Sequence, residues 1–348
     1  MKYKFLLITV LSLFISSCGG GSSSSSSQFL TGITYDTSSG KLIVLDFGLS
    51  IVQSVSALTG TATLTTLAGS SGNAGSTDST GTSAKFFGLD GVVSDTSGNF
   101  FVSDRYNQVI RKITSPTSTA TVSTFAGVVG TSGTSNGTTT AAYFNYPRGI
   151  AIDSSNNIYV ADTNSSTIRQ ITSAGVVTTL AGYAGTTGYT NGTSSAANFN
   201  YPNALATDGT YVFVADTANN QIRKIVISTG VVTTLAGNST GSSGYTNATS
   251  TSAYFNGPIG IATDGTNVYV TDFYNHSIRQ IVISTGVVTT LAGNTSGTSG
   301  YVNATSTSAY FSYPLGIAYY SGNLYVTDQS GTHIRVVSTS TGATTTLY

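Results

Sequence analysis

Aspartate and arginine stand seven residues apart at five places in the sequence, a pairing that could serve either acid–base chemistry or structure. In YVADTNSSTIRQI (residues 159–171), Asp162 precedes Arg169 with a polar loop between them. A general acid or base must be held against a substrate. A guanidinium can instead brace a carboxylate through its planar fork. The pairs are Asp104 and Arg111, Asp162 and Arg169, Asp216 and Arg223, Asp272 and Arg279, and Asp328 and Arg335.

These pairs belong to an internal repeat. The stretch YPRGIAIDSSNNIYVADTNSSTIRQITSAGVVTTLAG (residues 146–182) recurs at 201–237 and 257–293, and three weaker copies complete a set of six. Only the first copy, anchored by Asp46, lacks the arginine and has Gln53 instead. A catalytic pair is normally needed once, so a pair present in five of six copies is predicted to be structural. We expect its aspartate to end one strand and its arginine to lie on the next.

Each copy contains four short apolar stretches separated by turn residues, and no stretch has helical periodicity long enough to cover a sheet. This pattern predicts an all-β fold, a six-bladed β-propeller of four-stranded antiparallel blades. A parallel solenoid is the alternative, although four strands per period would be unusual for it. The predicted blades are residues 29–69, 86–127, 144–182, 199–237, 255–293 and 311–348.

The motifs within a copy resemble the NHL-repeat family of propellers. They are Phe144-x-x-Pro147-x-Gly149-Ile150-Ala151, Tyr159-Val160-Ala161-Asp162, Ile168-Arg169 and Leu180-Ala181-Gly182. The resemblance covers residues 29–348 and is strongest in copies three to five. The first copy lacks the Phe-x-x-Pro motif, and copy six has Tyr320 where the others have an aspartate. Deviant copies are normal at the ends of repeat arrays. We expect blade six to close against blade one by packing rather than by a shared strand.

The composition restricts the partners. The chain has 348 residues, with 13 basic and 13 acidic side chains, and every acidic one is aspartate. Without a basic surface, nucleic acid is not an expected partner. The single cysteine allows neither an intramolecular disulfide nor a cysteine-based zinc site.

That cysteine, Cys18, lies at the end of an N-terminal segment with the features of a targeting signal. Lys2 and Lys4 precede an apolar run from Phe5 to Ile15, too short to span a bilayer. Ending in Ile15-Ser-Ser-Cys18, this segment resembles a bacterial lipobox, which implies that residues 1–17 are a signal peptide and that Cys18 is lipidated. Residues 18–28 are then a Gly/Ser tether. The alternative is a plain secretory signal. Gly19 resembles outer-membrane sorting, so we expect a lipid-anchored protein of the outer membrane.

Two aspartates, Asp78 and Asp90, remain after the repeat positions are assigned. Five others occupy the first turn of a copy, where aspartate favours Asx turns: Asp36, Asp95, Asp153, Asp208 and Asp264. Asp90 belongs to a varied position just before the first-strand glycine, comprising Thr31, Asp90, Arg148, Asn203, Ile259 and Leu315. The first strand of a propeller blade lines the central channel, so these residues should ring one mouth. Asp90 and Arg148 would either bind a polar ligand or neutralise each other.

A second varied set follows the anchor aspartates. It includes Arg105 and Tyr106 in copy two and Phe273, Tyr274 and His276 in copy five. Exposed aromatic and arginine side chains are typical interface anchors, although such rings can equally shield blade edges. Two histidines, His276 and His333, are too few for a metal site, so neither a metal nor a cofactor is predicted. A phenylalanine before most copies is predicted to wedge between blades: Phe86, Phe144, Phe199, Phe255 and Phe311.

These observations predict a monomeric, non-catalytic binding scaffold on a cell envelope, with a protein or a glycan as its partner. The NHL resemblance also implies an alternative, since some similar propellers are metal-dependent lyases or hydrolases with sites at the central channel. Such sites need convergent His, Glu or Asp side chains. This sequence offers no glutamate, two histidines and, at the expected mouth, only Asp90.

Overall fold

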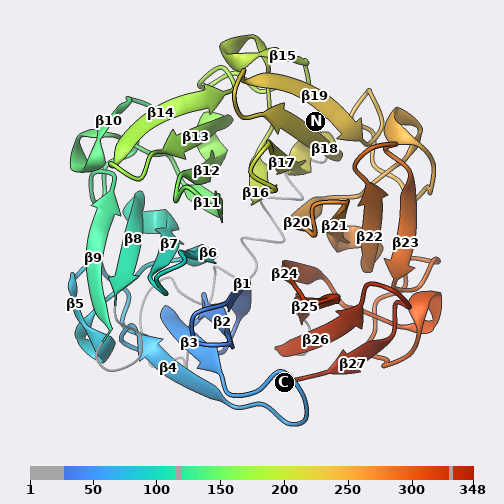
Figure 1. Cartoon of the computed structure of the whole chain (residues 1–348), viewed down its shortest axis with the longest axis horizontal. Helices are drawn as coiled ribbons and strands as arrows, with labels where there is room; N and C mark the ends of the chain where they lie inside the picture. Colours follow the sequence, from blue (N-terminus) through green and yellow to red (C-terminus); the bar gives the residue numbers. More distant parts are fainter. Residues whose placement is uncertain (1–26, 115–119, 329–331) are drawn as a thin grey trace, which may run out of the picture.

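The structure, a computed structural model, describes residues 27–114, 120–328 and 332–348. Its strands form six separate sheets arranged as blades around a central axis (Figure 1). The predicted signal peptide, Cys18 and most of the tether lie outside the described residues. None of the helices in the described ranges is long and apolar enough to cross a membrane. The predicted all-β, six-bladed propeller is confirmed.

The four longer strands of each blade run outward from the channel in chain order. Blade one contains β1 (Leu30–Asp36), β2 (Lys41–Asp46), β3 (Ile51–Val55) and β4 (Leu64–Ala68). Blade two contains β6 (Leu89–Ser94), β7 (Phe100–Asp104), β8 (Val109–Thr114), β9 (Thr121–Ala126) and β5 (Ser79–Thr80). Blade three contains β11 (Pro147–Ile152), β12 (Ile158–Asp162), β13 (Thr167–Ile171), β14 (Val176–Ala181) and β10 (Gly137–Thr138).

The other three blades follow the same order. Blade four contains β16 (Pro202–Thr207), β17 (Tyr211–Asp216), β18 (Gln221–Val226), β19 (Val231–Ala236) and β15 (Gly192–Thr193). Blade five contains β20 (Pro258–Thr263), β21 (Asn267–Asp272), β22 (Ser277–Val282) and β23 (Val288–Ala292). Blade six contains β24 (Pro314–Tyr320), β25 (Asn323–Asp328), β26 (His333–Ser338) and β27 (Thr344–Thr346).

Short 3-10 helices lie in the connections. They are η1 (Gly81–Ser83), η2 (Arg105–Asn107), η3 (Thr139–Ala141), η4 (Thr163–Ser165), η5 (Ser194–Ala196), η6 (Thr217–Asn219), η7 (Ser250–Ser252), η8 (Phe273–Asn275) and η9 (Ser306–Ser308). Four of these, η2, η4, η6 and η8, follow directly on an anchor aspartate and turn the chain from the second strand of a blade into the third.

The prediction of four strands in every blade is wrong for three of them. In blades two to four, a two-residue strand from the preceding connection (β5, β10 or β15) pairs with the outermost strand. In blades five and six the same contact shrinks to one bridge, between Thr249 and Val287 and between Thr305 and Ala343. Two-residue strands within Gly/Ser/Thr-rich connections carry no alternating pattern, so the sequence gives no signal for them.

The hydrophobic core lies between the blades. The predicted phenylalanine wedges are completely buried, each at 0% exposure. Phe144, for example, joins a cluster with Phe101 and Ile110 of blade two and Ile150 and Ile158 of blade three. Each sheet is therefore apolar on both faces because a neighbour covers each side.

The ring closes without a strand shared between its ends. Blade one is built from β1 to β4 and blade six from β24 to β27, in separate sheets. Leu30 and Leu42 pack with Ala318 and Ile334 at this seam. Tyr320 stacks on Tyr35 with ring centroids 3.4 Å apart, which accounts for the tyrosine at that position in copy six. Closure by packing, as expected from four strands per copy, is what the described residues show.

Glycines on the inner strands permit the blades to meet. A Cβ on Gly316 would overlap the carbonyl oxygen of Thr31 in blade one, and a Cβ on Gly260 would overlap that of Leu315 in blade six. Hydroxyl groups bridge the same gaps, since Thr327 Oγ1 donates to the carbonyl of Thr31 at 2.8 Å. The inner strands thus contact one another backbone to backbone.

Candidate functional site

Every predicted Asp–Arg pair forms a buried ion pair. The arginine Nη1 lies 2.7–3.2 Å from the aspartate Oδ2, and both side chains are at most 1% exposed. In blade three, the Arg169 fork also donates to the carbonyls of Tyr143 and Ser135 and to Asn136 Oδ1, at 2.9, 3.1 and 2.8 Å. The guanidinium therefore ties its own blade to the connection that precedes it.

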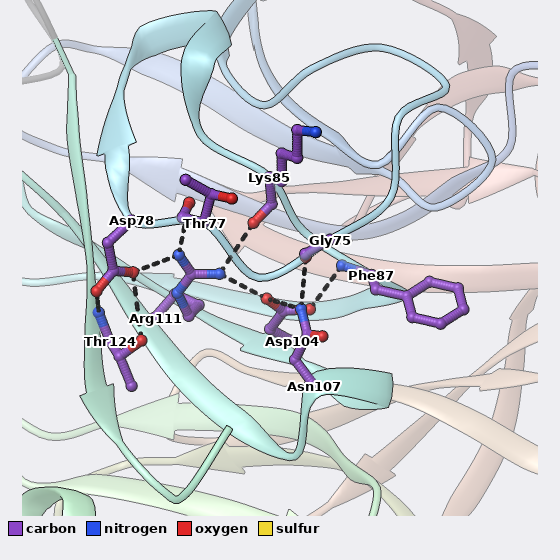
Figure 2. A network of polar contacts seen from close by, with 9 residues as sticks. All are labelled: Gly75, Thr77, Asp78, Lys85, Phe87, Asp104, Asn107, Arg111 and Thr124. Carbon is purple, nitrogen blue, oxygen red and sulfur yellow. Dashed lines mark hydrogen bonds and ion pairs between the residues drawn. The ribbon is translucent and has the colours of Figure 1, made fainter. Parts of the chain in front are cut away.

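In blade two, the fourth acceptor of the arginine's hydrogen bonds is Asp78, a residue to which the repeat pattern gave no role. Figure 2 shows Asp78 accepting a bond from Arg111 and two from Thr124, while Asp104 accepts from Arg111, Asn107 and Phe87 N–H. The equivalent residues in the next blades are Asn136, Asn191, Asn247 and Asn303. The signal was present in the sequence, because each of these residues lies 32 or 33 positions before its arginine.

Burial sets the titration of the anchor carboxylates. It raises the pKa of Asp104, Asp162, Asp216 and Asp328 to about 6, while the arginine and amide donors oppose the rise. These groups are still ionised at pH 7. Losing one arginine would leave an unpaired buried charge, which is the costly case for an ion pair.

Blade one departs from the network at the predicted position. Asp46 is fully buried and accepts from Phe29 N–H and Leu49 N–H through Oδ1. Its Oδ2 has no partner among the described residues, and the same holds for Gln53 Oε1. In the other blades the remaining arginine acceptors come from the preceding connection. In blade one that part of the sequence falls in residues 1–26, outside the described ranges.

The varied ring before the first-strand glycine does line the central channel. The cavity there has a volume of about 90 Å³, and Thr31, Asp90, Asn203, Ile259 and Leu315 line it. Arg148 stands beside it, with its carbonyl against Gly91 of the preceding blade, blade two. The mouth is polar over blades one to four and apolar over blades five and six. Its volume matches about three waters, far below the roughly 300 Å³ or more of small-molecule pockets.

Asp90, Arg148 and Arg105 converge at this mouth. Asp90 Oδ2 lies 3.6 Å from Arg105 Nη1 and 3.7 Å from Arg148 Nε, longer than the charged hydrogen bonds of about 2.7–2.9 Å expected for a close pair. The arginine side chains are 9% and 14% exposed, and neither Nε has a hydrogen-bond partner within the described residues. Burial lowers the pKa of Arg148 to about 10, and the positive charge of Arg105 adds to the effect.

Aromatic rings lie beside Arg105. Arg105 Cζ lies 4.9 Å from the ring centre of Tyr106 and 5.6 Å from that of Tyr146. Phe87, with its ring centre 4.7 Å from that of Tyr106, is 44% exposed. We name the set Phe87, Asp90, Arg105, Tyr106, Tyr146 and Arg148 the mouth cluster.

The loop tyrosines have a packing role as well. Tyr106 and Tyr274 lie directly against Gly88 and Gly257, where a Cβ would clash with the rings. Blade three has Asn164 at the equivalent loop position, and there the residue matching Gly88 is Tyr146, at a φ of 56°. The aromatic ring at this contact therefore comes from the loop tyrosine in blades two and five, and from Tyr146 in blade three. This pattern agrees with the shielding alternative for Tyr106 and Tyr274.

Phe273 and His276 are also embedded in the frame. Phe273 is 7% exposed and packs on Tyr274 and Tyr313. His276 is 7% exposed, and its Nδ1 accepts a bond from Tyr313 N–H at 3.1 Å. Gln108 and Asn220 make the same bond to the next blade, at 2.6 and 2.8 Å. Burial holds the pKa of His276 below its ordinary value of 6.5, in keeping with a neutral acceptor.

Among residues 27–114, 120–328 and 332–348, no three His, Cys, Asp or Glu side chains group as metal ligands. His333 instead packs against Tyr301, with ring centres 4.5 Å apart.

A closed ring of six blades with a constant frame and one varied mouth defines the class, a six-bladed β-propeller. Residues 144–171 and 255–281, in blades three and five, match the family model of the NHL repeat. A curated relative, the protein SUPPRESSOR OF QUENCHING 1, chloroplastic, from Arabidopsis thaliana, is 28% identical over 206 residues, or 57% of this chain. This chain spans only 19% of that relative's length.

Solved structures share the fold at low identity. An auxiliary nutrient binding protein from Bacteroides thetaiotaomicron aligns with a TM-score of 0.63 and 14% identity, covering 88% of this chain and 68% of that one. Its counterpart from Bacteroides ovatus gives 0.62 and 17%, covering 89% and 69%. Virginiamycin B lyase from Staphylococcus aureus gives 0.56 and 15%, covering 91% and 83%. At these identities the likeness concerns the fold.

Proposed function

We propose that this chain is a non-catalytic binding propeller, lipid-anchored at Cys18 in a bacterial cell envelope, and that it binds a glycan on the face of the mouth cluster. One observation carries the proposal. The frame repeats from blade to blade, whereas the mouth cluster brings together two guanidinium groups sharing one distant carboxylate, beside an exposed phenylalanine. Aromatic surface with a few placed polar groups is typical of ligand sites.

The fold comparisons also support a binding function. Two structures of this fold are auxiliary nutrient binding proteins from Bacteroides. A lyase also shares the fold. However, no observation within the described residues favours the metal-dependent alternative. The near-neutral composition offers no broad basic surface for nucleic acid.

Glycan binding is tested with the full-length chain purified in detergent and screened against envelope polysaccharides. We expect Phe87→Ala to weaken binding at least fivefold, because it removes the exposed ring of the mouth cluster. Tyr183→Ala, which removes a ring that is 58% exposed in the connection after β14, should leave binding unchanged. Equal effects of the two variants would contradict a mouth-face site. A bound protein, or a glycan recovered chemically altered, would point to the other functions considered above.

The lipid anchor is tested by fractionating cells that express Cys18→Ser. Without a thiol to acylate, we expect the variant to leave the membrane fraction, while the unaltered chain stays there. An unchanged distribution would remove the anchor from the proposal and leave the binding site untouched.

A further inference from the structure

The mouth cluster has an unbalanced charge. Arg105 and Arg148 come from different blades, and Asp90 is the carboxylate within ion-pair distance of both. The five frame arginines differ, because each directs its terminal nitrogens at an aspartate, two carbonyls and an Asp or Asn side-chain oxygen, as Arg223 does. Two cations sharing one anion at 3.6 and 3.7 Å leave one excess positive charge, and within the described residues neither arginine Nε has a hydrogen-bond partner.

This residual charge is partly buried. The arginine side chains are 9% and 14% exposed, and Asp90 is 20% exposed. A charge withdrawn from water needs a partner, and the planar guanidinium fork suits a carboxylate. One excess positive charge is neutralised by a ligand with a single negative charge. A phosphate dianion would bring one negative charge more than the cluster can neutralise.

The dimensions of the cavity decide what else the ligand contains. The channel cavity of about 90 Å³, which Asp90 lines and the two arginines do not, is too small to hold a whole sugar beside the cluster. The rest of the ligand must lie on the rim. There the ring of Phe87 is 44% exposed and stands 4.7 Å from Tyr106. An exposed ring beside a cation suits a flat ligand with an apolar face and one attached carboxylate.

We propose that the mouth cluster binds a uronic acid unit of an acidic glycan, with the carboxylate between Arg105 and Arg148 and the sugar ring against Phe87. This inference rests on the proposed function and specifies its ligand class. Asp90 then has a defined effect. It competes with the ligand carboxylate for the same two guanidinium groups, and so holds the affinity down.

The test uses calorimetry on the full-length chain with tetragalacturonic acid and its methyl ester, in which each carboxylate is converted to a neutral ester on the same sugar backbone. We expect the acid to bind at least tenfold more tightly than the ester. Arg105→Gln and Arg148→Gln should each weaken binding of the acid at least tenfold. Lys112→Gln, on β8 of blade two, the blade that contains Arg105, is the matched control and should change nothing. Asp90→Asn should tighten binding several-fold, and this gain does not depend on an arginine variant folding.

Different results would overturn the carboxylate site, the sugar assignment and the proposed function. Equal affinity for acid and ester, or weaker binding by Asp90→Asn, would overturn the carboxylate site. Competition by inorganic phosphate at the affinity of the acid would show a general anion site and overturn the sugar assignment. If neutral glycans bind in a Phe87-dependent way and the acid does not, this inference fails while the proposed function stands. If no glycan binding depends on Phe87, both fail.

Discussion

Replacing Arg223 by alanine is expected to lower the free energy of unfolding by about 3–5 kcal/mol, because it leaves Asp216 buried and ionised without its partner. Asp216 and Arg223 are both 0% exposed, and four acceptors around the guanidinium lose their donor. For a domain of this size the melting temperature should fall by roughly 5–10 °C. Differential scanning calorimetry at pH 7.5 measures the shift.

Arg148→Ala is the control for the same chemical change. Arg148 is 14% exposed, and Asp90 keeps a second cation in Arg105 when it is lost. We expect a change within about 1 kcal/mol. The double variant Asp216→Leu with Arg223→Met should be less destabilised than Arg223→Ala, because it buries no unpaired charge. Equal shifts for Arg223→Ala and Arg148→Ala would contradict the separation of frame from mouth.

Gly316→Ala is expected to destabilise the propeller by about 3 kcal/mol or more, because the added methyl group must displace backbone. Its Cβ would overlap the Thr31 carbonyl across the closure seam and would lie 3.1 Å from Thr327 Oγ1. Since a packed seam holds blade six to blade one, we expect the variant to unfold at lower urea concentration and to lose protease resistance first in β1 and β24.

Gly75→Ala supplies the comparison. The atoms nearest to a Cβ at Gly75 belong to the Lys85 side chain, with Cδ at 3.0 Å, and this flexible stem can move. We expect an effect below about 1 kcal/mol. If Gly316→Ala were equally mild, the inner strands would have to be free to separate, contrary to the observed contact.

The fold could be predicted from the sequence because every copy repeats the same turn residues and packing residues. Asp153 illustrates this: its carboxylate accepts from the N–H groups of Ser155 and Asn157, both at 2.9 Å, as an Asx turn requires. Phe144 likewise occupies the predicted wedge between blades. Both depend on contacts that recur at a fixed spacing, so alignment of the copies suffices to find them.

Contacts between copies were harder to foresee. His276 accepts a bond from the N–H of Tyr313, in the following blade. The loop tyrosines Tyr106 and Tyr274 look like free anchors until the glycines beneath them are placed. Arg105 and Arg148 could be identified as variable, but their approach to one carboxylate depends on the curvature of the ring.

The place where the chain enters the propeller limits what can reach the mouth. Ser27, the first described residue, lies against Gly48, next to Phe47, whose ring centre is 6.1 Å from that of Tyr106. With Cys18 lipidated as proposed, nine residues connect the bilayer to this face. This tether is at most about 30 Å long when fully extended. The binding face would then look toward the membrane across a narrow gap. A thin polymer can slide into such a gap, whereas a bulky globular partner is kept out by its size.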